Sequence, residues 1–456
     1  MDERHHRPPR IVILGGGFGG AYCAQELERR LGGTEAEVVL IDRNNYFIFY
    51  PLLVEAGTGS LEPRHAVVSI RAFLDRTRLI MGEVRGLDLG RREVSYRLAS
   101  TDEERRLEYD HLVFALGSVT RLPPVPGLAQ HGFEMKSLAD AVGLRDRAIR
   151  QLEMADAVDD PEHRRRLLHF VVVGANFTGV EVAGEFDVFL RRAAKLYRHL
   201  DPEDVTVTLI EVGDRILPAL ESDLAEFATR SLRSRGVRIE LGTSVARVEP
   251  DFAELTDGRR LDTETVIWCG GIAPSPVLER LPLPRDQRGY VVCERDLRVQ
   301  GLAEVWAVGD SAVNRGPEGE PYPATAQHAV RQGQHLARNL VRVIRGDAAL
   351  PCDIRSAGAL AALGCRTGVA KVFGVKLSGF PAWFLWRTVY LLKMPGLSRR
   401  LRVALDWTMD LLFAKDAVQL GLTGVRTAAR GPSEREDPSR FPTTAEDEQP
   451  RQRRIA

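Results

Sequence analysis

Short runs of apolar residues recur along the chain, and many of them end in a glycine turn or an acidic residue. Runs of this kind, without polar alternation, predict strands that are buried on both faces of a parallel sheet. The first run, at residues 10–14, is followed by GGGFGG and by a helical pattern over residues 21–30. The next, at residues 37–41, ends at Asp42. This order of strand, glycine turn, helix and strand predicts a dinucleotide-binding unit.

The same order of elements occurs a second time. HFVVVG predicts a strand, NFTGVEVAGEFDVFLRRAAKLYRHL a helix, and VTVTLIE a strand that ends at Glu211. Between the two copies lie short alternating segments at 82–112, typical of antiparallel strands, and a charged helical stretch at 138–166. The repeat predicts an α/β protein with two Rossmann-like dinucleotide-binding domains.

The first glycine turn has the full Gly-x-Gly-x-x-Gly spacing at Gly15, Gly17 and Gly20. The first glycine permits the tight turn, the second lets backbone approach a pyrophosphate, and the third lets helix pack on strand. Asp42 stands where a carboxylate accepts hydrogen bonds from ribose hydroxyls. The alternative is a glycine-rich packing turn without a ligand.

A second feature indicates which nucleotide the first turn binds. Gly309 and Asp310 follow a buried apolar run, in WAVGDSA. A carboxylate there can bind the sugar-alcohol chain of a flavin whose ADP half lies at the first turn, which predicts FAD. The alternative is that Asp310 caps the next helix.

The C-terminal part has a different pattern. AWFLWRTVYLLKM is too short to span a bilayer, and in SRRLRVALDWTMDLLF the polar residues Arg399, Arg402, Asp406 and Asp410 form one narrow helical stripe. A helix this apolar either docks in a core or lies in a bilayer interface, and Trp beside basic residues favours the interface. A dimerisation or core-covering hairpin is the alternative.

Composition narrows the possible functions. The 456 residues carry 63 basic and 63 acidic side chains, so the net charge gives no reason to expect nucleic-acid binding. The five cysteines form no CxxC or CxxxxC pair, so we expect no metal site, no iron–sulfur cluster and no redox-active disulfide. Electrons would leave a flavin to quinone, oxygen or a protein. The polar start and the absence of a long apolar run predict a cytoplasmic body.

These stretches together resemble a known family. IVILGGGFGG, IDRNNYFIFYPLLVEAGTGSLEP, VVVGANFTGVEVAGE, TVIWCGGIAP, WAVGDSA, AQHAVRQG and FPAWFLWRTVYLLKMPG are similar to the type II NADH dehydrogenases, non-proton-pumping NADH:quinone oxidoreductases. The resemblance implies five parts: FAD-binding residues 8–130, NAD(P)H-binding residues 131–290, an FAD-binding return with a quinone-site helix at 291–378, amphipathic membrane-attachment helices at 379–425, and a disordered tail at 426–456.

The resemblance also implies roles for residues of the second turn. NADH pyrophosphate is expected at Gly174, Asn176 and Gly179, and its ribose on Glu211. Asn176 replaces the middle glycine; Asn tolerates positive φ, and its amide could donate to a phosphate oxygen. A domain that no longer binds nucleotide is the alternative. Glu181 is expected near the flavin–nicotinamide stack, and a helix N-terminal acid without a catalytic role is its alternative.

The quinone is expected beside AQHAVRQG, where Gln327 matches a family glutamine and Arg331 replaces a second one. Glu211 favours NADH over NADPH, although Arg215 is close enough to weaken that preference. We therefore expect a peripheral enzyme on the cytoplasmic face of the cell membrane that passes hydride from NADH to FAD and electrons to quinone. We expect no nucleic-acid partner, and the sequence allows either a monomer or a homodimer. The alternatives are a soluble NAD(P)H oxidase or ferredoxin-type reductase, and a flavin-bearing redox sensor.

Overall fold

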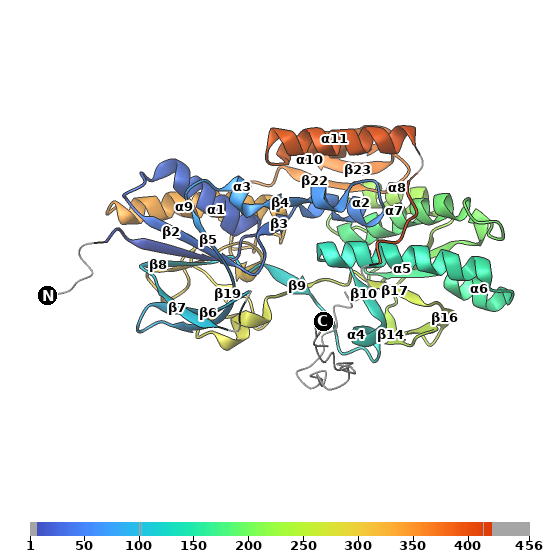
Figure 1. The fold of residues 1–456 in the computed structure, drawn as a ribbon, viewed down its shortest axis with the longest axis horizontal. Coiled ribbons are helices and arrows are strands. Elements are labelled where there is room, and N and C mark those ends of the chain that lie inside the picture. Colours follow the sequence, from blue (N-terminus) through green and yellow to red (C-terminus); the bar gives the residue numbers. More distant parts are fainter. Residues whose placement is uncertain (1–6, 100, 102, 414, 422–456) are drawn as a thin grey trace, which may run out of the picture.

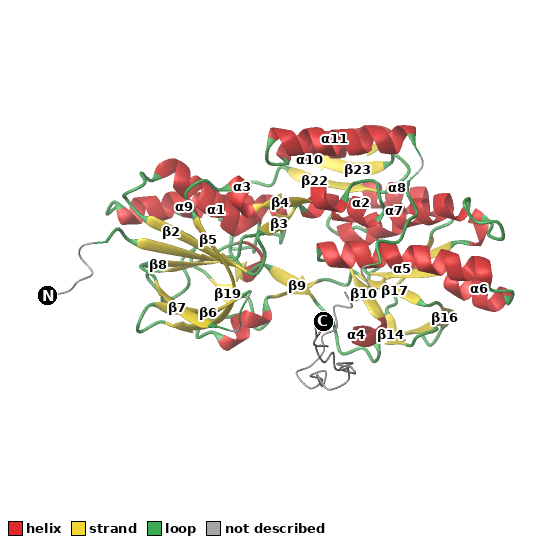
Figure 2. Ribbon diagram, viewed as in Figure 1, coloured by secondary structure: helices red, strands yellow, loops and turns green. Residues whose placement is uncertain are grey.

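A computed structural model describes residues 7–99, 101, 103–413 and 415–421. Two α/β units lie side by side along the long axis, and a smaller C-terminal layer lies across the top of the second unit and of the junction between the two (Figures 1 and 2). The predicted tail at 426–456 lies outside the described residues.

The first unit is built on a seven-stranded sheet in which parallel strands continue into an antiparallel edge. Its order is β20 (Val305–Ala307), β8 (His111–Phe114), β1 (Arg10–Leu14), β2 (Glu37–Asp42), β5 (Arg78–Asp88), β6 (Glu93–Leu98) and β7 (Glu104–Glu108). Helices α1 (Phe18–Arg30) and α9 (Ala326–Ile344) pack against each other beside it. A Cβ on Gly333 would lie 2.2 Å from the Gly19 carbonyl oxygen, so this crossing needs a glycine. Strand β20 therefore returns from far along the chain to the sheet that begins it, as WAVGDSA suggested.

The second unit repeats the arrangement with a five-stranded parallel sheet. Its order is β10 (Gly132–Glu134), β17 (Thr265–Trp268), β11 (His169–Val173), β12 (Thr206–Glu211) and β13 (Arg238–Leu241). Its helices are α5 (Leu138–Ala157), α6 (Pro161–Leu167), α7 (Phe177–Ala194) and α8 (Ser222–Arg233), and an antiparallel sheet of β14 (Val245–Val248), β15 (Phe252–Leu255) and β16 (Arg260–Asp262) lies below (Figure 1).

Short elements complete the two units and the junction between them. A two-stranded pairing of β9 (Ser118–Thr120) with β18 (Ile272–Pro274) lies at the junction. The others are β3 (Tyr46–Ile48), α2 (Leu53–Gly57), β4 (Val67–Ser69), α3 (Ile70–Phe73), α4 (Leu128–His131), β19 (Val291–Val292) and β21 (Ala312–Val313).

The C-terminal layer contains a sheet that the sequence did not lead us to expect. Strands β22 (Gly358–Ala362), β23 (Gly368–Val372) and β24 (Val375–Gly379) form an antiparallel sheet. Helix α10 (Phe380–Lys393) packs on this sheet, and α11 (Leu397–Leu412) follows it as the second helix of a hairpin. Both predicted C-terminal helices are present. The predicted region ran to residue 425, whereas α11 ends at Leu412 and the described residues 413 and 415–421 are not helical.

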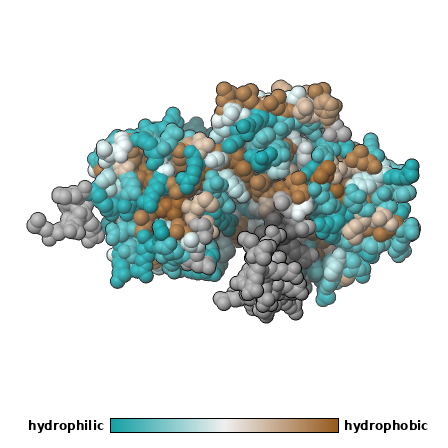
Figure 3. Space-filling view, in the orientation of Figure 1, coloured by the Kyte–Doolittle hydropathy of each residue, from teal (hydrophilic) through white to brown (hydrophobic). Residues whose placement is uncertain are grey.

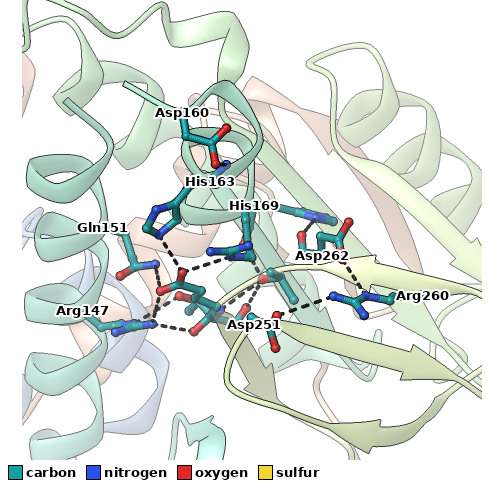
Figure 4. A network of polar contacts seen from close by, with 12 residues as sticks. Arg147, Gln151, Asp160, His163, His169, Asp251, Arg260 and Asp262 are labelled. Carbon is teal, nitrogen blue, oxygen red and sulfur yellow. Dashed lines mark hydrogen bonds and ion pairs between the residues drawn. The ribbon is translucent and has the colours of Figure 1, made fainter. Parts of the chain in front are cut away.

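A polar network holds the lower edge of the second unit together (Figure 4). The carboxylate of Glu264 lies within 3.6 Å of Arg147, 3.2 Å of Arg166 and 3.3 Å of His163, which come from α5 and α6. His169 accepts from the Thr208 hydroxyl and donates to the Asp262 carbonyl, each at 2.8 Å. These groups lie at the start of the parallel strands, away from the glycine turns at their ends. The network therefore serves to anchor helices to the sheet rather than to bind nucleotide.

Candidate functional site

The first glycine turn has the geometry that a dinucleotide requires. Gly15 has φ of +100°, and a Cβ there would lie 2.3 Å from the Ala115 carbonyl oxygen. A Cβ on Gly20 would lie 1.9 Å from the Gly15 carbonyl oxygen, whereas one on Gly17 would meet nothing within 4 Å. The fold itself therefore requires Gly15 and Gly20, and Gly17 leaves open space beside the N-terminus of α1. That open space is where a pyrophosphate reaches backbone N–H groups.

Asp42 is held at the end of β2 by two backbone donors. Its carboxylate accepts from the amide of Gly16 at 2.6 Å and from that of Asn44 at 2.7 Å. Burial raises the pKa of Asp42, and these two hydrogen bonds act against the rise. The carboxylate is thus fixed beside the glycine turn, where ribose hydroxyls would meet it.

Asp310 follows a strand of the same sheet that carries the first turn. It follows β20 in a short 3₁₀ turn, and the Ser118 hydroxyl donates to it at 2.9 Å. The Lys136 ammonium donates to Ser118 at 3.0 Å. The next α-helix, α9, begins only at Ala326, and Asp310 does not cap it. The capping alternative is therefore wrong, and the role of this carboxylate in binding the sugar-alcohol chain of FAD stays a prediction.

Gln332 is a site residue that the sequence analysis did not single out for this role. Its buried amide oxygen accepts from the Gly309 amide at 2.7 Å and from the Asn314 amide at 3.1 Å. A cavity of about 240 Å³ is lined here by residues of both units, including Ile272, Asp310 and Gln332. Gln332 directly precedes Gly333 in α9, and only the folded helix shows that its side chain reaches the turn after β20.

The second glycine turn copies the first, except at its middle residue. Gly174 has φ of +98°, and a Cβ on Gly179 would lie 1.7 Å from the Gly174 carbonyl oxygen. Asn176 has φ of −72° and ψ of −173°, which is extended backbone. Its side chain accepts from the Gly179 amide at 3.2 Å and donates to the Cys269 carbonyl at 2.6 Å.

This geometry corrects our reasoning on Asn176. The turn makes no use of the tolerance of asparagine for positive φ, because the backbone at this residue is extended. The side-chain amide, which we expected to be available for a phosphate oxygen, is bonded to Cys269. Asn176 thus acts as the N-cap of α7 and as a tie to β17.

Glu211 occupies in the second unit the place of Asp42 in the first. It accepts from the amide of Ala175 at 2.6 Å and from that of Gly213 at 2.9 Å. Each amide is at the same offset as its counterpart around Asp42. The Arg215 guanidinium donates to the Pro218 carbonyl at 3.0 Å rather than to Glu211. The two turns are therefore equivalent, residue by residue, in how they place a carboxylate.

Glu181 joins the second unit to the C-terminal layer. Its carboxylate accepts from the Ala362 amide in β22 at 3.1 Å and from the Trp386 indole in α10 at 3.3 Å. Burial raises the pKa of Glu181 to about 8, and both hydrogen bonds oppose the rise. These partners belong to other elements, so Glu181 ties α7 to β22 and α10, and its catalytic role stays a prediction.

Gln327 and Arg331 hold a loop of the C-terminal layer. The Gln327 amide donates to the Ser356 hydroxyl and to the Gly358 carbonyl, each at 3.1 Å. The Arg331 guanidinium donates to the Arg355 carbonyl. Both side chains lie along α9 and hold the segment that leads into β22.

Comparison with known proteins decides the family. A family model described as pyridine nucleotide-disulphide oxidoreductase matches residues 9–333, and one described as NDH2 C-terminal domain matches residues 357–416. The chain is 30% identical over 449 residues to type II NADH:quinone oxidoreductase Ndh of Mycobacterium tuberculosis, covering 94% of each chain. It is 32% identical over 406 residues to demethylphylloquinone reductase NdbB of Synechocystis sp., covering 88% of this chain and 95% of the relative.

This chain belongs to the type II NADH:quinone oxidoreductase family. The solved structure of NDH2 from Plasmodium falciparum in complex with NADH shares its fold, with a TM-score of 0.84 over 90% of this chain and 100% of that one at 20% identity. The predicted family and the two-domain α/β fold are confirmed. The expectation of an FAD-dependent NADH:quinone oxidoreductase is confirmed at the level of the family.

The type II oxidoreductase has five free cysteines, although its first family model is named for disulphide chemistry. Cys23, Cys269 and Cys352 are buried, Cys293 is partly buried and Cys365 is exposed. Burial raises the pKa of the Cys269 thiol to about 12, so this thiol beside the second turn is an inert core group.

The C-terminal helices of the type II oxidoreductase turn an apolar face outward. Figure 3 shows hydrophobic residues along the top of the molecule, over α10 and α11. The exposed apolar side chains, which we call the outer face, are Phe380, Phe384, Leu392, Leu397, Leu401, Leu405, Met409, Leu411, Leu412 and Phe413. No helix in the described part of the chain is long and apolar enough to cross a bilayer.

Part of the polar stripe of α11 faces the protein. In an ordinary surface amphipathic helix, the polar side faces water and the apolar side faces the protein. Asp406 bonds to the His65 ring and accepts from the Glu62 amide. Asp410 lies 3.9 Å from Arg387, whose guanidinium carbon is 4.5 Å from the Trp383 ring centroid and 4.7 Å from that of Trp407. The hairpin is thus docked on the protein through charged and aromatic groups while its outer face remains apolar, so it combines features of both readings of the sequence.

Proposed function

We propose that this enzyme binds FAD at the first turn and NADH at the second, and reduces a quinone that reaches Glu181 from a membrane surface beneath the outer face. The observation that carries the proposal is that Glu181, on the helix of the NADH turn, is hydrogen-bonded to both β22 and α10. The same carboxylate therefore touches the nucleotide unit and the layer that would meet the membrane.

The first turn would hold the FAD pyrophosphate on backbone near Gly17, its ribose on Asp42 and its sugar-alcohol chain on Asp310. When bound, FAD accepts a hydride from NADH and gives two electrons to a quinone. Gln332 orients the Gly309 amide, and Ser118 fixes the Asp310 carboxylate. These contacts pre-organise the binding groups, so little ordering remains when the cofactor binds.

The second turn selects NADH over NADPH. Glu211 is fixed by two amides at the strand end, where it accepts from a ribose 2′-hydroxyl and repels a 2′-phosphate. The Arg215 guanidinium donates to the Pro218 carbonyl of its own loop rather than to Glu211, so it does not tie up that carboxylate. The turnover ligand is therefore NADH.

The quinone would approach between α9 and α10. Arg331 and Gln327 hold the loop before β22 at that junction, and Tyr390 packs edge-on against Phe49 and Trp386, with centroids 6.3 and 5.0 Å apart. Arg331 replaces a family glutamine and already donates to a carbonyl. Its guanidinium would act on the quinone mainly by its charge, and Gln327 by keeping the loop in place.

The outer face would lie on the cytoplasmic surface of the cell membrane. Leu405 and Phe384 have exposed fractions of 63% and 60%. Large apolar side chains that are exposed together in this way mark an interaction surface. Full burial of a leucine stabilises by about 1.5–3 kcal/mol, so Leu405→Glu should weaken vesicle binding at least about tenfold. Burial of the same face against a second copy would instead give a dimer, which sedimentation without lipid detects.

One kinetic experiment tests the function. The FAD holoenzyme is mixed with NADH or NADPH in a stopped-flow instrument, and flavin absorbance is followed before and after addition of ubiquinone and menaquinone analogues. We expect fast bleaching with NADH, slow bleaching with NADPH, and repeated turnover with quinone. Rapid reoxidation by oxygen alone would support a soluble oxidase, and one stoichiometric reduction without repeated quinone turnover would support a redox sensor.

A further inference from the structure

Lys136 belongs to the second unit but reaches into the first. It stands between β10 and α5, where its own backbone amide and that of Ser137 donate to the Asp140 carboxylate at 3.1 and 2.6 Å. The Ser137 hydroxyl in return accepts from the Asp140 amide at 3.0 Å, which completes a capping box. The backbone of Lys136 is therefore fixed at the start of α5, while its side chain extends to β9 at the junction of the two units (Figure 1).

The Lys136 ammonium lies among residues of the first unit. It donates to the Ser118 hydroxyl at 3.0 Å, and that hydroxyl donates to Asp310 at 2.9 Å. It also lies 4.8 Å from the centroid of the Tyr50 ring. The Tyr50 ring is in turn 6.4 Å from the ring of Phe18, the first residue of α1. Two separate sets of contacts thus place the ammonium close to Asp310 and to the first glycine turn.

This ammonium has no carboxylate bonded to it. In the part of the chain that the structure describes, Lys136 makes no ion pair, and Ser118 is its hydrogen-bond acceptor. Burial lowers the pKa of Lys136, and the nearby charge of Asp310 opposes that fall without cancelling it. A partly buried ammonium usually has a charged partner, because it has lost part of its hydration. Lys136 can therefore bind a further anion.

The region that the ammonium faces is open and lies between the carboxylates expected to bind FAD. Tyr50 is 41% exposed, and Gly17 leaves open space beside the N-terminus of α1. Burial raises the pKa of the Tyr50 hydroxyl to about 12, and the charges of Asp310 and Asp42 add to the rise. The tyrosine that Lys136 contacts is thus close enough to feel both carboxylates.

FAD carries two phosphate groups between its adenosine and its sugar-alcohol chain. Backbone N–H groups beside Gly17 can bind these phosphates, but such donors carry only partial charges. We propose that Lys136 binds the FAD phosphate that adjoins the sugar-alcohol chain; this assignment rests on the FAD site proposed above. The unit that binds NADH then supplies a full positive charge to the cofactor of the other unit, and FAD is held by both.

The dissociation constant of FAD tests this contact. The apoprotein is titrated with FAD, and binding is followed by flavin fluorescence. Lys136→Met keeps the length of the side chain without its charge, and the loss of a charge-assisted hydrogen bond should weaken FAD binding roughly 10- to 100-fold. Lys136→Arg keeps the charge and should bind within about threefold of the wild type. Unchanged binding in Lys136→Met would overturn the proposal.

Lys195→Met is the matched control for net charge. Lys195 is exposed just beyond α7, whose 18 residues place it about 27 Å from the second turn. Loss of this charge should leave FAD binding unchanged. Raised ionic strength should weaken binding equally in the wild type and Lys195→Met, and less in Lys136→Met, because that variant has lost a contact between charges. The same salt dependence in all three proteins would contradict a phosphate contact.

A double-mutant cycle separates a phosphate contact from an indirect effect through Ser118. Ser118→Ala removes the hydroxyl that joins Lys136 to Asp310. If Lys136 acted only by orienting that hydroxyl, Lys136→Met would not weaken FAD binding further in the Ser118→Ala protein, and the proposal would be overturned. We expect most of the loss caused by Lys136→Met to remain in that background.

The midpoint potential of the bound flavin shows which part of FAD the ammonium meets. A phosphate contact stabilises oxidised and reduced FAD alike, so Lys136→Met should have the wild-type potential. A lower potential in the variant would place the charge beside the ring that gains electrons and would overturn the phosphate assignment. Failure of the wild type to bind FAD would overturn the proposed function together with this contact. Tight FAD binding that does not depend on Lys136 would overturn the contact alone.

Discussion

Replacement of Asn176 by glycine restores the glycine pattern of the second turn, and the structure indicates that it will weaken the protein there. The asparagine side chain makes two hydrogen bonds, from the Gly179 amide at 3.2 Å and to the Cys269 carbonyl at 2.6 Å. Loss of an asparagine N-cap to glycine costs a few tenths of a kcal/mol. Loss of the second bond costs about 1 kcal/mol, since Cys269 still accepts from the Gly271 amide.

Glycine brings no compensating relief of strain, because φ at this position is −72°. Its greater freedom in the unfolded chain adds roughly 0.5–1 kcal/mol. We therefore expect Asn176→Gly to lower the free energy of unfolding by about 2 kcal/mol. Urea unfolding of the apoprotein gives the magnitude, and hydrogen exchange of the amides at 174–185 shows whether the loss is located at this turn.

Asn176→Ser is the matched control. Serine keeps the cap on Gly179 but cannot reach Cys269, so its loss should be about 1 kcal/mol. The same variants test NADH binding. Glycine frees the Gly179 amide for a phosphate, so KM for NADH should fall or stay level. Unchanged stability in Asn176→Gly would show that the asparagine side chain does not stabilise the turn. A KM for NADH that rises tenfold would show that this side chain binds NADH, and either result would refute the reasoning.

Three further predictions follow from the site. Gly20→Ala should lower the free energy of unfolding of the apoprotein by about 3 kcal/mol, because its Cβ would meet backbone. Gly17→Ala should leave that free energy unchanged and weaken FAD binding in a titration at least about tenfold. Equal behaviour of the two variants would contradict the open space at Gly17. Glu211→Ala should lower kcat/KM for NADH about 10–100-fold in initial rates without a matching loss for NADPH, and parallel losses would exclude the proposed selectivity. Folding raises the pKa of Glu181, so stability should fall as pH rises from about 4.5 to about 8; Glu181→Gln should reduce that slope in urea unfolding, and an unchanged slope would argue against a proton on Glu181.

Much of the nucleotide-binding architecture could be predicted from the sequence because its determinants are local. Residues 10–42 contain a complete strand, turn, helix and strand, and the glycines and Asp42 lie where that order requires. The second copy, from His169 to Glu211, has the same property. The helix after the first turn begins at Phe18 rather than at Ala21, because GGGFGG contributes its own last residues to the first helical turn.

The sheet of β22–β24 was not foreseen, because its strands are short and contain glycine, alanine and lysine instead of a run of branched apolar residues. Its position decides the environment of Glu181. The Ala362 amide and the Trp386 indole lie 181 and 205 residues further along the chain. No pattern around TGVE indicates either partner.

The sequence by itself determined the two dinucleotide-binding units, their glycine turns and the carboxylates at the strand ends, since hydrophobic period and backbone freedom act over a few neighbouring residues. Only the tertiary structure decided that Asn176 is a cap, and that Glu55 and Asp410 share the Arg387 guanidinium. Those properties depend on which distant side chains exclude water from a group and which supply a hydrogen bond, and such neighbours are brought together only by folding.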